Sequence, residues 1–244
     1  SIFFAGLLLI AGLVWVFWSY GQNLPDYSQL SKYEPPVVSR VYASDGALLD
    51  EFATEKRLFV PIQSIPSIVK EAFLSSEDKD FYSHSGLDFK AIIRAAITNL
   101  QNYNSGKRAI GASTITQQIA KNFLLSSDYS FERKIKEAIL ALRIERTFSK
   151  DHIFELYLNE IYLGLNSYGV AAAALNYFDK PLSQISLEEA AYLAALPKGP
   201  NNYHPIKKTK QAKIRRNWVL SQMHKNGLIT RNELNKASLL KLKV

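Results

Sequence analysis

Two groups of charged side chains along this chain have the types and spacing that acid–base chemistry requires. The first group begins at Glu77-Asp78 and continues with Phe81, His84, Gly86 and Asp88. A carboxylate at a helix end beside aromatic rings can have its pKa raised by desolvation, as a general base needs. The same residues can equally be a helix terminus and a turn, with His84 and Asp88 as caps. Histidine spacing such as H-x-x-x-H is absent, which disfavours a histidine zinc site.

The second group, Arg133, Lys134 and Glu137, lies within one predicted helix over residues 131–146. The helical period places the core face of that helix at Ile135, Ala138, Ile139 and Leu142, with Glu137 about 160° from it. A carboxylate flanked by two cations stays ionised. The competing interpretation is an exposed i,i+4 ion pair that contributes only a few tenths of a kcal/mol.

A third candidate lies at the predicted start of another helix, where residues 111–122 place hydroxyls before two amides and a lysine. Ser113 is predicted to cap this helix, and Gln117, Gln118, Lys121 and Asn122 follow within it. A helix N-terminus with hydroxyls and a nearby ammonium suits phosphate oxygens or sugar hydroxyls. Two exposed glutamines without a function are the alternative.

The elements that must position these residues are mostly helices. Ser64 is predicted to cap a helix that runs toward Glu77, and Asp88 to cap an amphipathic helix to Leu100 whose Arg94 points away from the apolar stripe. Further helices are expected at 151–163, 170–177 and 187–196, with a basic pair at the end. Asp45-Gly46, between apolar runs, indicates a hairpin turn. The chain is therefore predicted to be mainly α, with one small β-hairpin.

The first residues are strongly apolar, and composition restricts the remaining chemistry. Ile2–Trp18 carries no charge and spans roughly 25 Å as a helix, near the short end for a membrane span, so we predict an anchor rather than a signal peptide. The absence of Lys and Arg from 19–31 favours the non-cytoplasmic side. Cysteine is absent from the 244 residues, which excludes disulfides and thiolate catalysis.

The net charge of +8 is concentrated near the end of the chain. From Lys207 onward there are eleven Lys/Arg residues and one acid, Glu233. Such a segment can meet nucleic acid, an anionic bilayer surface or pyrophosphate, or it can be a solvated helical face. The predicted anchor and the lack of a nucleic-acid motif disfavour DNA binding.

Five segments in order resemble the motifs of glycosyltransferase family 51, the peptidoglycan glycosyltransferase domain of class A penicillin-binding proteins and monofunctional transglycosylases. The first three contain the groups described above. The other two run from Glu155 to Gly164 and from Glu188 to Pro205. The resemblance covers most of residues 40–225. It implies a lysozyme-like fold with a larger lobe and a smaller jaw that dips into the membrane, in which 88–100 is our candidate for part of the jaw.

The apolar run, the turn signal and the resemblance together divide the chain into a transmembrane anchor at 1–20, a linker and β-hairpin at 21–60, and a glycosyltransferase domain at 61–244. It implies polymerisation of lipid II into β-1,4-linked glycan strands, with inversion and release of undecaprenyl pyrophosphate. Glu77 matches the general base and Glu137 the second catalytic glutamate. The remaining matched or candidate substrate-binding residues are Asp78, His84, Arg94, Ser113, Gln117, Gln118, Lys121, Asn122, Arg133 and Lys134.

The resemblance requires no cofactor and leaves room for a divalent cation, Mg or Mn, at Glu137. It implies lipid II, the growing strand and the bilayer as partners, with other cell-wall synthesis proteins as further candidates and no nucleic acid. It also implies a single-pass protein of the bacterial cytoplasmic membrane, with its catalytic domain outside. Two alternatives stay open: a lytic transglycosylase or muramidase, and a non-catalytic membrane-tethered scaffold.

Two departures from the family pattern stand out. Many members have arginine where this chain has Tyr129, which removes one pyrophosphate contact and predicts weaker donor binding. Ser67-Ile68-Val69-Lys70 fits the S-x-x-K pattern of transpeptidases, but no S-D-N or K-T-G follows it, so no transpeptidase domain is expected here. The sequence leaves open whether the protein is monofunctional, its stem-peptide preference and its oligomeric state.

Overall fold

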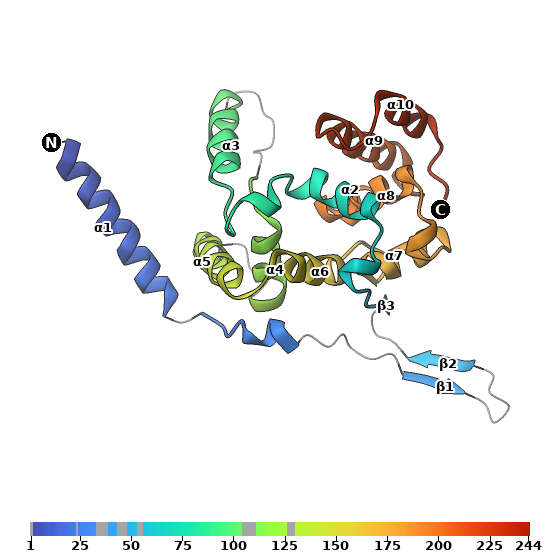
Figure 1. Ribbon diagram of the computed structural model, residues 1–244, viewed down its shortest axis with the longest axis horizontal. Coiled ribbons are helices and arrows are strands. Elements are labelled where there is room, and N and C mark those ends of the chain that lie inside the picture. The colour runs from blue at the N-terminus through green and yellow to red at the C-terminus, as the bar shows by residue number, and fades with distance from the viewer. Residues whose placement is uncertain are drawn as a thin grey trace. The chain divides into compact units, whose positions relative to one another are not determined.

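The computed structural model describes residues 2–22, 24–32, 39–42, 48–52, 56–103, 111–125 and 130–244. The described chain is mainly helical, and packing divides it into two compact units that are each discontinuous in sequence (Figure 1). The first unit comprises Ser1–Lys32 and Asp80–Ile153, and the second comprises Tyr33–Lys79 and Phe154–Val244. The predicted division into an anchor, a linker and a domain at residues 20 and 60 stays a prediction.

The first unit contains α1 (Ile2–Gly21), α3 (Phe89–Gln101), α4 (Ile115–Leu124) and α5 (Phe131–Thr147), and α6 (Lys150–Glu160) begins in it. Helices α4 and α5 pack against each other, and α1 also contacts α5. Two hydrogen bonds attach the segment after α1 to this unit. Arg143 Nη2 donates to the Gly21 carbonyl at 3.0 Å, and the His152 Nε2 atom lies 3.2 Å from the Leu30 carbonyl.

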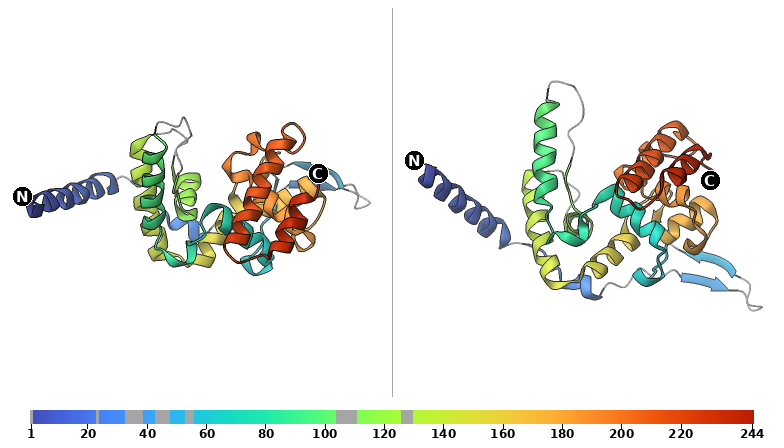
Figure 2. Two further views of the ribbon diagram at one scale, coloured as in Figure 1. Left: turned by 90° about the horizontal axis from the view of Figure 1, so that it is seen from above. Right: turned by 45° about the horizontal axis from the view of Figure 1, so that its top comes forward.

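The second unit contains the rest of α6 together with α2 (Ser67–Glu77), α7 (Val170–Phe178), α8 (Leu187–Leu193), α9 (Thr209–Lys225) and α10 (Arg231–Leu239). Helix α2 packs on α8 and α9, and α9 and α10 lie side by side (Figure 2). The alanines at 171–174 and 190–191 are buried, and Phe73 of α2 packs edge-on against Tyr157 of α6 with ring centroids 6.3 Å apart.

The strands are short. Strand β1 (Ser39–Tyr42) pairs antiparallel with β2 (Leu48–Phe52), with Ser39 opposite Phe52. The predicted turn at Asp45-Gly46 lies outside the described residues, so the hairpin stays a prediction. Strand β3 (Lys56–Arg57) pairs in parallel with β4 (Ser167–Tyr168) within the second unit.

Helix starts were predicted with mixed success. Asp88 caps α3 as expected, because its Oδ1 accepts the Ala91 amide at 2.9 Å. The cap of α4 is Thr114 rather than Ser113. Ser64 does not cap α2 either, because it ends a short 3₁₀ turn and the helix begins at Ser67 after Pro66. The two predicted caps lie one and two residues from the observed ones, within the usual uncertainty of helix ends.

The buried face of α5 differs from the predicted one. Ile139 is buried as predicted, together with Glu137, Leu140, Ala141 and Ile144, whereas Ile135, Ala138 and Leu142 are only half-buried. The prediction followed hydrophobicity and placed Glu137 away from the core. Packing against α4 instead turns that carboxylate inward, so the interpretation of Glu137 as an exposed ion pair is wrong.

Helices also occupy the two segments for which membrane contact was predicted. Among the residues that the structure describes, no helix is both long and apolar enough to cross a bilayer. The anchor predicted at Ile2–Trp18 therefore stays a prediction, although α1 covers these residues. On α3, the apolar stripe is exposed to solvent, with Phe89 at 66%, Ile93 at 61% and Leu100 at 78%.

Candidate active site

A buried carboxylate with two cations forms the centre of the first unit's site. The Glu137 side chain is 1% exposed, and its Oε2 accepts Lys134 Nζ at 2.5 Å. Its Oε1 lies 3.1 Å from Arg133 Nε, in an ion pair whose angle is poor for a hydrogen bond. The spacing of three and four residues predicted this arrangement, because such residues share one helix face. Because the carboxylate is buried, removing either cation would leave its charge poorly compensated, which is not so for a surface pair.

The start of α4 adds a hydroxyl to this group. Lys134 Nζ also donates to Ser113 Oγ at 3.1 Å, so one ammonium links the start of α4 with α5. Thr114 and Gln117 form a capping box: the Gln117 amide donates to Thr114 Oγ1 at 3.1 Å, and Gln117 Oε1 accepts the Thr114 amide at 3.0 Å. The side chain of Gln117 thus fixes the start of α4.

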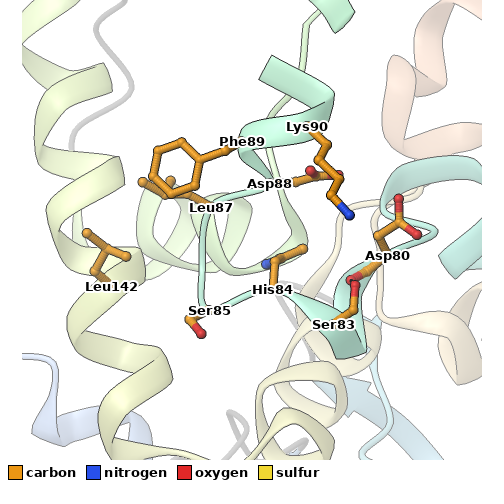
Figure 3. A pocket seen from close by; sticks show the side chains of 9 residues that line it. All are labelled: Asp80, Ser83, His84, Ser85, Leu87, Asp88, Phe89, Lys90 and Leu142. Carbon is orange, nitrogen blue, oxygen red and sulfur yellow. The ribbon is translucent and has the colours of Figure 1, made fainter. Parts of the chain in front are cut away.

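The motif around His84 lines a pocket of about 370 Å³ in the first unit. His84 is half-buried and packs edge-on against the Phe81 ring, with centroids 6.2 Å apart. In Figure 3, the Lys90 side chain points toward the side of the pocket where Asp80 lies, and Phe89 lies on the side of Leu142. The pocket therefore offers charges of both signs on one side and an apolar wall on the other.

Gly86 explains why this turn passes so close to α5. Its φ is +94°, and a Cβ there would lie 2.8 Å from the Ala141 carbonyl oxygen. Only glycine combines that conformation with such a close approach. The Gly86 carbonyl accepts Thr114 Oγ1 at 2.7 Å, so the same turn is also tied to the start of α4.

In the second unit, Glu77 is the last residue of α2 and is half-buried. Ser76 Oγ lies 3.3 Å from Glu77 Oε1 and 2.8 Å from the Ala194 carbonyl. Asp78 is 7% exposed. Tyr157 of α6 is fully buried, and burial, followed by the charges of Glu77 and Asp78, holds the pKa of its hydroxyl well above the usual value.

Arg215 of α9 also belongs to the surroundings of Glu77, which the sequence did not indicate. Burial lowers the pKa of Arg215, whereas the charges of Glu77 and, to a smaller extent, Tyr203 raise it. In the sequence it was one of eleven cations in a basic segment. Its one distinguishing signal was Trp218 three residues later, over whose ring the guanidinium carbon lies at 3.8 Å.

The other predicted site residues have varied surroundings. Arg94 on α3 and Asn122 on α4 are exposed, whereas Lys121 is half-buried. Glu77 and Asp78 belong to the second unit, and the remaining predicted residues belong to the first. Tyr129 lies outside the described residues.

A family model described as "Transglycosylase" matches residues 45–224 of the chain. Among curated proteins, penicillin-binding protein 1A of Rickettsia felis is 49% identical over 236 residues, and that of Rickettsia prowazekii is 48% identical over 236 residues. Each alignment covers 96% of this chain and 30% of the relative. Penicillin-binding protein 1A of Aquifex aeolicus is 47% identical, with 95% of this chain and 31% of the relative covered.

The chain thus spans about a third of the length of these relatives. A crystal structure of penicillin-binding protein 1A from Haemophilus influenzae aligns with 86% of this chain and 21% of that one. The TM-score of that alignment is 0.49 and the sequence identity is 26%.

Proposed function

Because the chain belongs to the transglycosylase family, we propose that it is a peptidoglycan glycosyltransferase that polymerises lipid II. The observation that carries the proposal within the structure is the buried Glu137, which holds Arg133 and Lys134 beside Ser113. Two fixed cations and a hydroxyl next to a helix start suit a pyrophosphate group. A muramidase that cleaves glycan without such a leaving group has no need of them.

In the proposed reaction, the 4-hydroxyl of the acceptor GlcNAc attacks the anomeric carbon of the donor MurNAc. The new β-1,4 bond forms as the α-linked undecaprenyl pyrophosphate leaves, so the configuration inverts. A neutral hydroxyl is a poor nucleophile, and Glu77 accepts its proton as the bond forms. Ser76, fixed to the Ala194 carbonyl, limits the positions that the Glu77 carboxylate can take.

The departing pyrophosphate gains negative charge, which fixed cations stabilise without reorganisation. Glu137 acts through those cations, as a positioning residue that holds Arg133 and Lys134 in place. Lys121, half-buried on α4, is the further cation that we assign to the leaving group. Gln118 is the amide that we assign to the sugar, together with the hydroxyl of Ser113.

A divalent metal at Glu137, the option that the sequence left open, does not fit the residues present. Both carboxylate oxygens of Glu137 already face a cation, Lys134 on one side and Arg133 on the other. Within the described part of the chain, no three histidine or acidic side chains gather closely enough to hold a metal ion. We therefore assign the steps above to side chains.

Contact with a bilayer follows from the same proposal, because lipid II is a membrane lipid. We assign the exposed apolar face of α3, with Phe89, Ile93 and Leu100, to the membrane surface, and α1 to the anchor. A contiguous apolar helix face is rarely left in water unless it meets a partner. Replacing Ile93 and Leu100 with aspartate should reduce binding to anionic lipid vesicles, and unchanged co-sedimentation would argue against this assignment.

The decisive assay incubates the purified protein with lipid II and separates the products by gel electrophoresis. The parent should make glycan polymer, and Glu77→Gln should make none. Glu71→Gln, on the same helix, is the matched control and should retain polymerisation. Soluble muropeptides released from sacculi, with no polymer from lipid II, would favour the muramidase. Polymerisation by Glu77→Gln at the parent's rate would overturn the assignment of the base.

A further inference from the structure

The first unit holds a second buried charged cluster in addition to the Glu137 site. The side chain of Glu145, on α5, is 5% exposed and pairs at 2.7 Å with the Nζ of Lys150, whose side chain is 20% exposed. The same carboxylate oxygen, Oε1, accepts a hydrogen bond at 2.5 Å from the hydroxyl of Thr116, a fully buried residue of α4. The Lys150 ammonium also lies 4.2 Å from the centroid of the Phe81 ring. We call Thr116, Glu145, Lys150 and Phe81 the Glu145 cluster.

The helix ends themselves disfavour both charges of this cluster. Glu145 lies in the last turn of α5, where the partial charge of the helix is negative, and Lys150 is the first residue of α6, where it is positive. Burying an ion pair also costs desolvation, so such a pair is weak evidence of a contribution to stability. Neither local helix stability nor burial therefore explains the pair. A fully bonded charged cluster can instead fix the geometry of the groups around it.

At one end, the cluster supports the segment Phe81–Gly86, which we call the His84 turn. Phe81, whose ring meets the Lys150 ammonium, is fully buried and packs edge-on against His84 with centroids 6.2 Å apart. A Cβ added at Gly86 would lie 3.2 Å from Glu145 Cγ, so this turn also passes close to the Glu145 side chain. His84 lines the pocket shown in Figure 3. The position of this pocket wall thus depends on Lys150 and Glu145.

At the other end, the cluster fixes the start of α4. Thr116 lies in the first turn of that helix, and its hydroxyl is held by Glu145. Thr114, two residues earlier, donates its hydroxyl to a backbone carbonyl of the His84 turn at 2.7 Å. Directly before this cap lies Ser113, which accepts a hydrogen bond from Lys134 Nζ. The cluster therefore joins the pocket wall to the helix start at the proposed pyrophosphate site.

We propose that Glu145 and Lys150 are positioning residues that hold the His84 turn and the start of α4 at a fixed separation for catalysis. This inference rests on the proposed function. The leaving pyrophosphate gains its charge only in the transition state, so the groups that meet it are effective only when their geometry is fixed in advance. Glu145 and Lys150 act on that geometry through Thr116 and Phe81.

The test measures lipid II polymerisation by the parent, Lys150→Met and Thr116→Val. Each change nearly keeps the shape of the side chain and removes one of the two donors to Glu145 Oε1 described above. Each should lower kcat by roughly 10- to 100-fold, because a displacement of about 1 Å can cost about 100-fold. The KM for lipid II should change little, because interactions made only in the transition state affect kcat and kcat/KM equally. Thr116→Ser, which keeps the hydroxyl, and Lys150→Arg, which keeps the charge, should recover most of the lost rate.

Hydrogen exchange of backbone amides gives a second readout that needs no substrate. In K150M and T116V, exchange should become faster at residues 81–88 and 113–118 and stay unchanged in α10. A double variant should lose less kcat than the product of the two single losses, because both substitutions act through the same carboxylate.

Lys180→Met is the matched control. Lys180 pairs with Glu189 at the same distance, 2.7 Å, in the second unit. This variant should lose some stability in urea unfolding, whereas its kcat should stay at the parent value. It separates the loss of an ion pair as such from the loss of the Glu145 cluster.

Each variant is first checked for folding by circular dichroism and urea unfolding at the assay temperature. If K150M does not fold, T116V carries the test, because it leaves both charges in place. Folded variants with the kcat of the parent would overturn the proposal, and so would unchanged exchange in the His84 turn. A raised KM with an unchanged kcat would also contradict it, because the cluster would then set substrate affinity.

The outcome is separable from that of the proposed function. If the parent polymerises and Glu77→Gln does not, while K150M and T116V match the parent, the proposed function stands and the role of the Glu145 cluster fails. If the parent makes no polymer from lipid II, the proposed function fails, and hydrogen exchange still decides whether the cluster holds the His84 turn.

Discussion

The buried ion pairs of Glu137 should make this residue far more important for stability than its surface counterpart on the same helix. Glutamine at position 137 keeps the shape of the side chain and removes the charge that Arg133 and Lys134 share. The exposed fraction is 1% for the Glu137 side chain, 10% for Arg133 and 37% for Lys134. Removing one partner of a buried pair costs about 3–5 kcal/mol. We take the lower end, ~3 kcal/mol, because Lys134 can turn toward water.

Glu132→Gln provides the matched comparison. Glu132 pairs with Lys136 at 2.7 Å, also on α5, but their side chains are 54% and 26% exposed. A pair of this kind contributes less than about 1 kcal/mol. Urea unfolding followed by circular dichroism gives both free-energy changes. In 1 M salt the loss in Glu132→Gln should shrink, whereas the loss in Glu137→Gln should persist, because buried pairs are poorly screened.

Equal losses of unfolding free energy in Glu137→Gln and Glu132→Gln would refute the reasoning. They would mean that the same substitution on the same helix costs the same whether or not the carboxylate is buried. A loss in Glu137→Gln that disappears in high salt would do so as well. It would mean that the carboxylate is solvated in solution and does not hold the two cations.

Three further results are expected from single substitutions. Gly169→Ala should lower the midpoint of thermal unfolding sharply, because φ at this residue is +81° and an added Cβ would lie 2.4 Å from a backbone oxygen. Gly111→Ala should change the midpoint little, because no atom of the described residues lies within 4 Å of a Cβ added there. Burial raises the pKa of Tyr177 from 10.0 to about 12, so its contribution to stability is full below pH 10 and is lost as the pH rises toward 12. In Tyr177→Phe, the free energy of unfolding measured by urea titration should therefore fall less steeply over this pH range than in the parent. Burial likewise raises the pKa of Glu160 from 4.5 to about 7, so its contribution to stability is full below pH 4.5 and declines up to pH 7. Glu160→Gln should therefore be more stable than the parent at pH 8 but not at pH 4.

Local features were predictable from the sequence because they depend on residues a few positions apart. The cap of α3 by Asp88 needed only an acceptor before an amphipathic run. The pairing of Glu137 with Arg133 and Lys134 needed only the helical period. The ordered motifs also identified the family, because residue types at fixed spacing can be recognised along the chain without knowing how the helices pack.

The tertiary structure decided which side of each helix is buried and which distant residues meet. Hydrophobicity placed the core face of α5 at residues 135, 138, 139 and 142. Ile139 is buried as predicted, but the other three are only half-buried and Glu137 is buried as well. Helix α9 packs on α2 although the two helices lie far apart along the chain, so no local pattern encodes this contact. A helix determines the spacing of its own side chains, whereas only its neighbours determine whether a charge meets water, another charge or a buried surface.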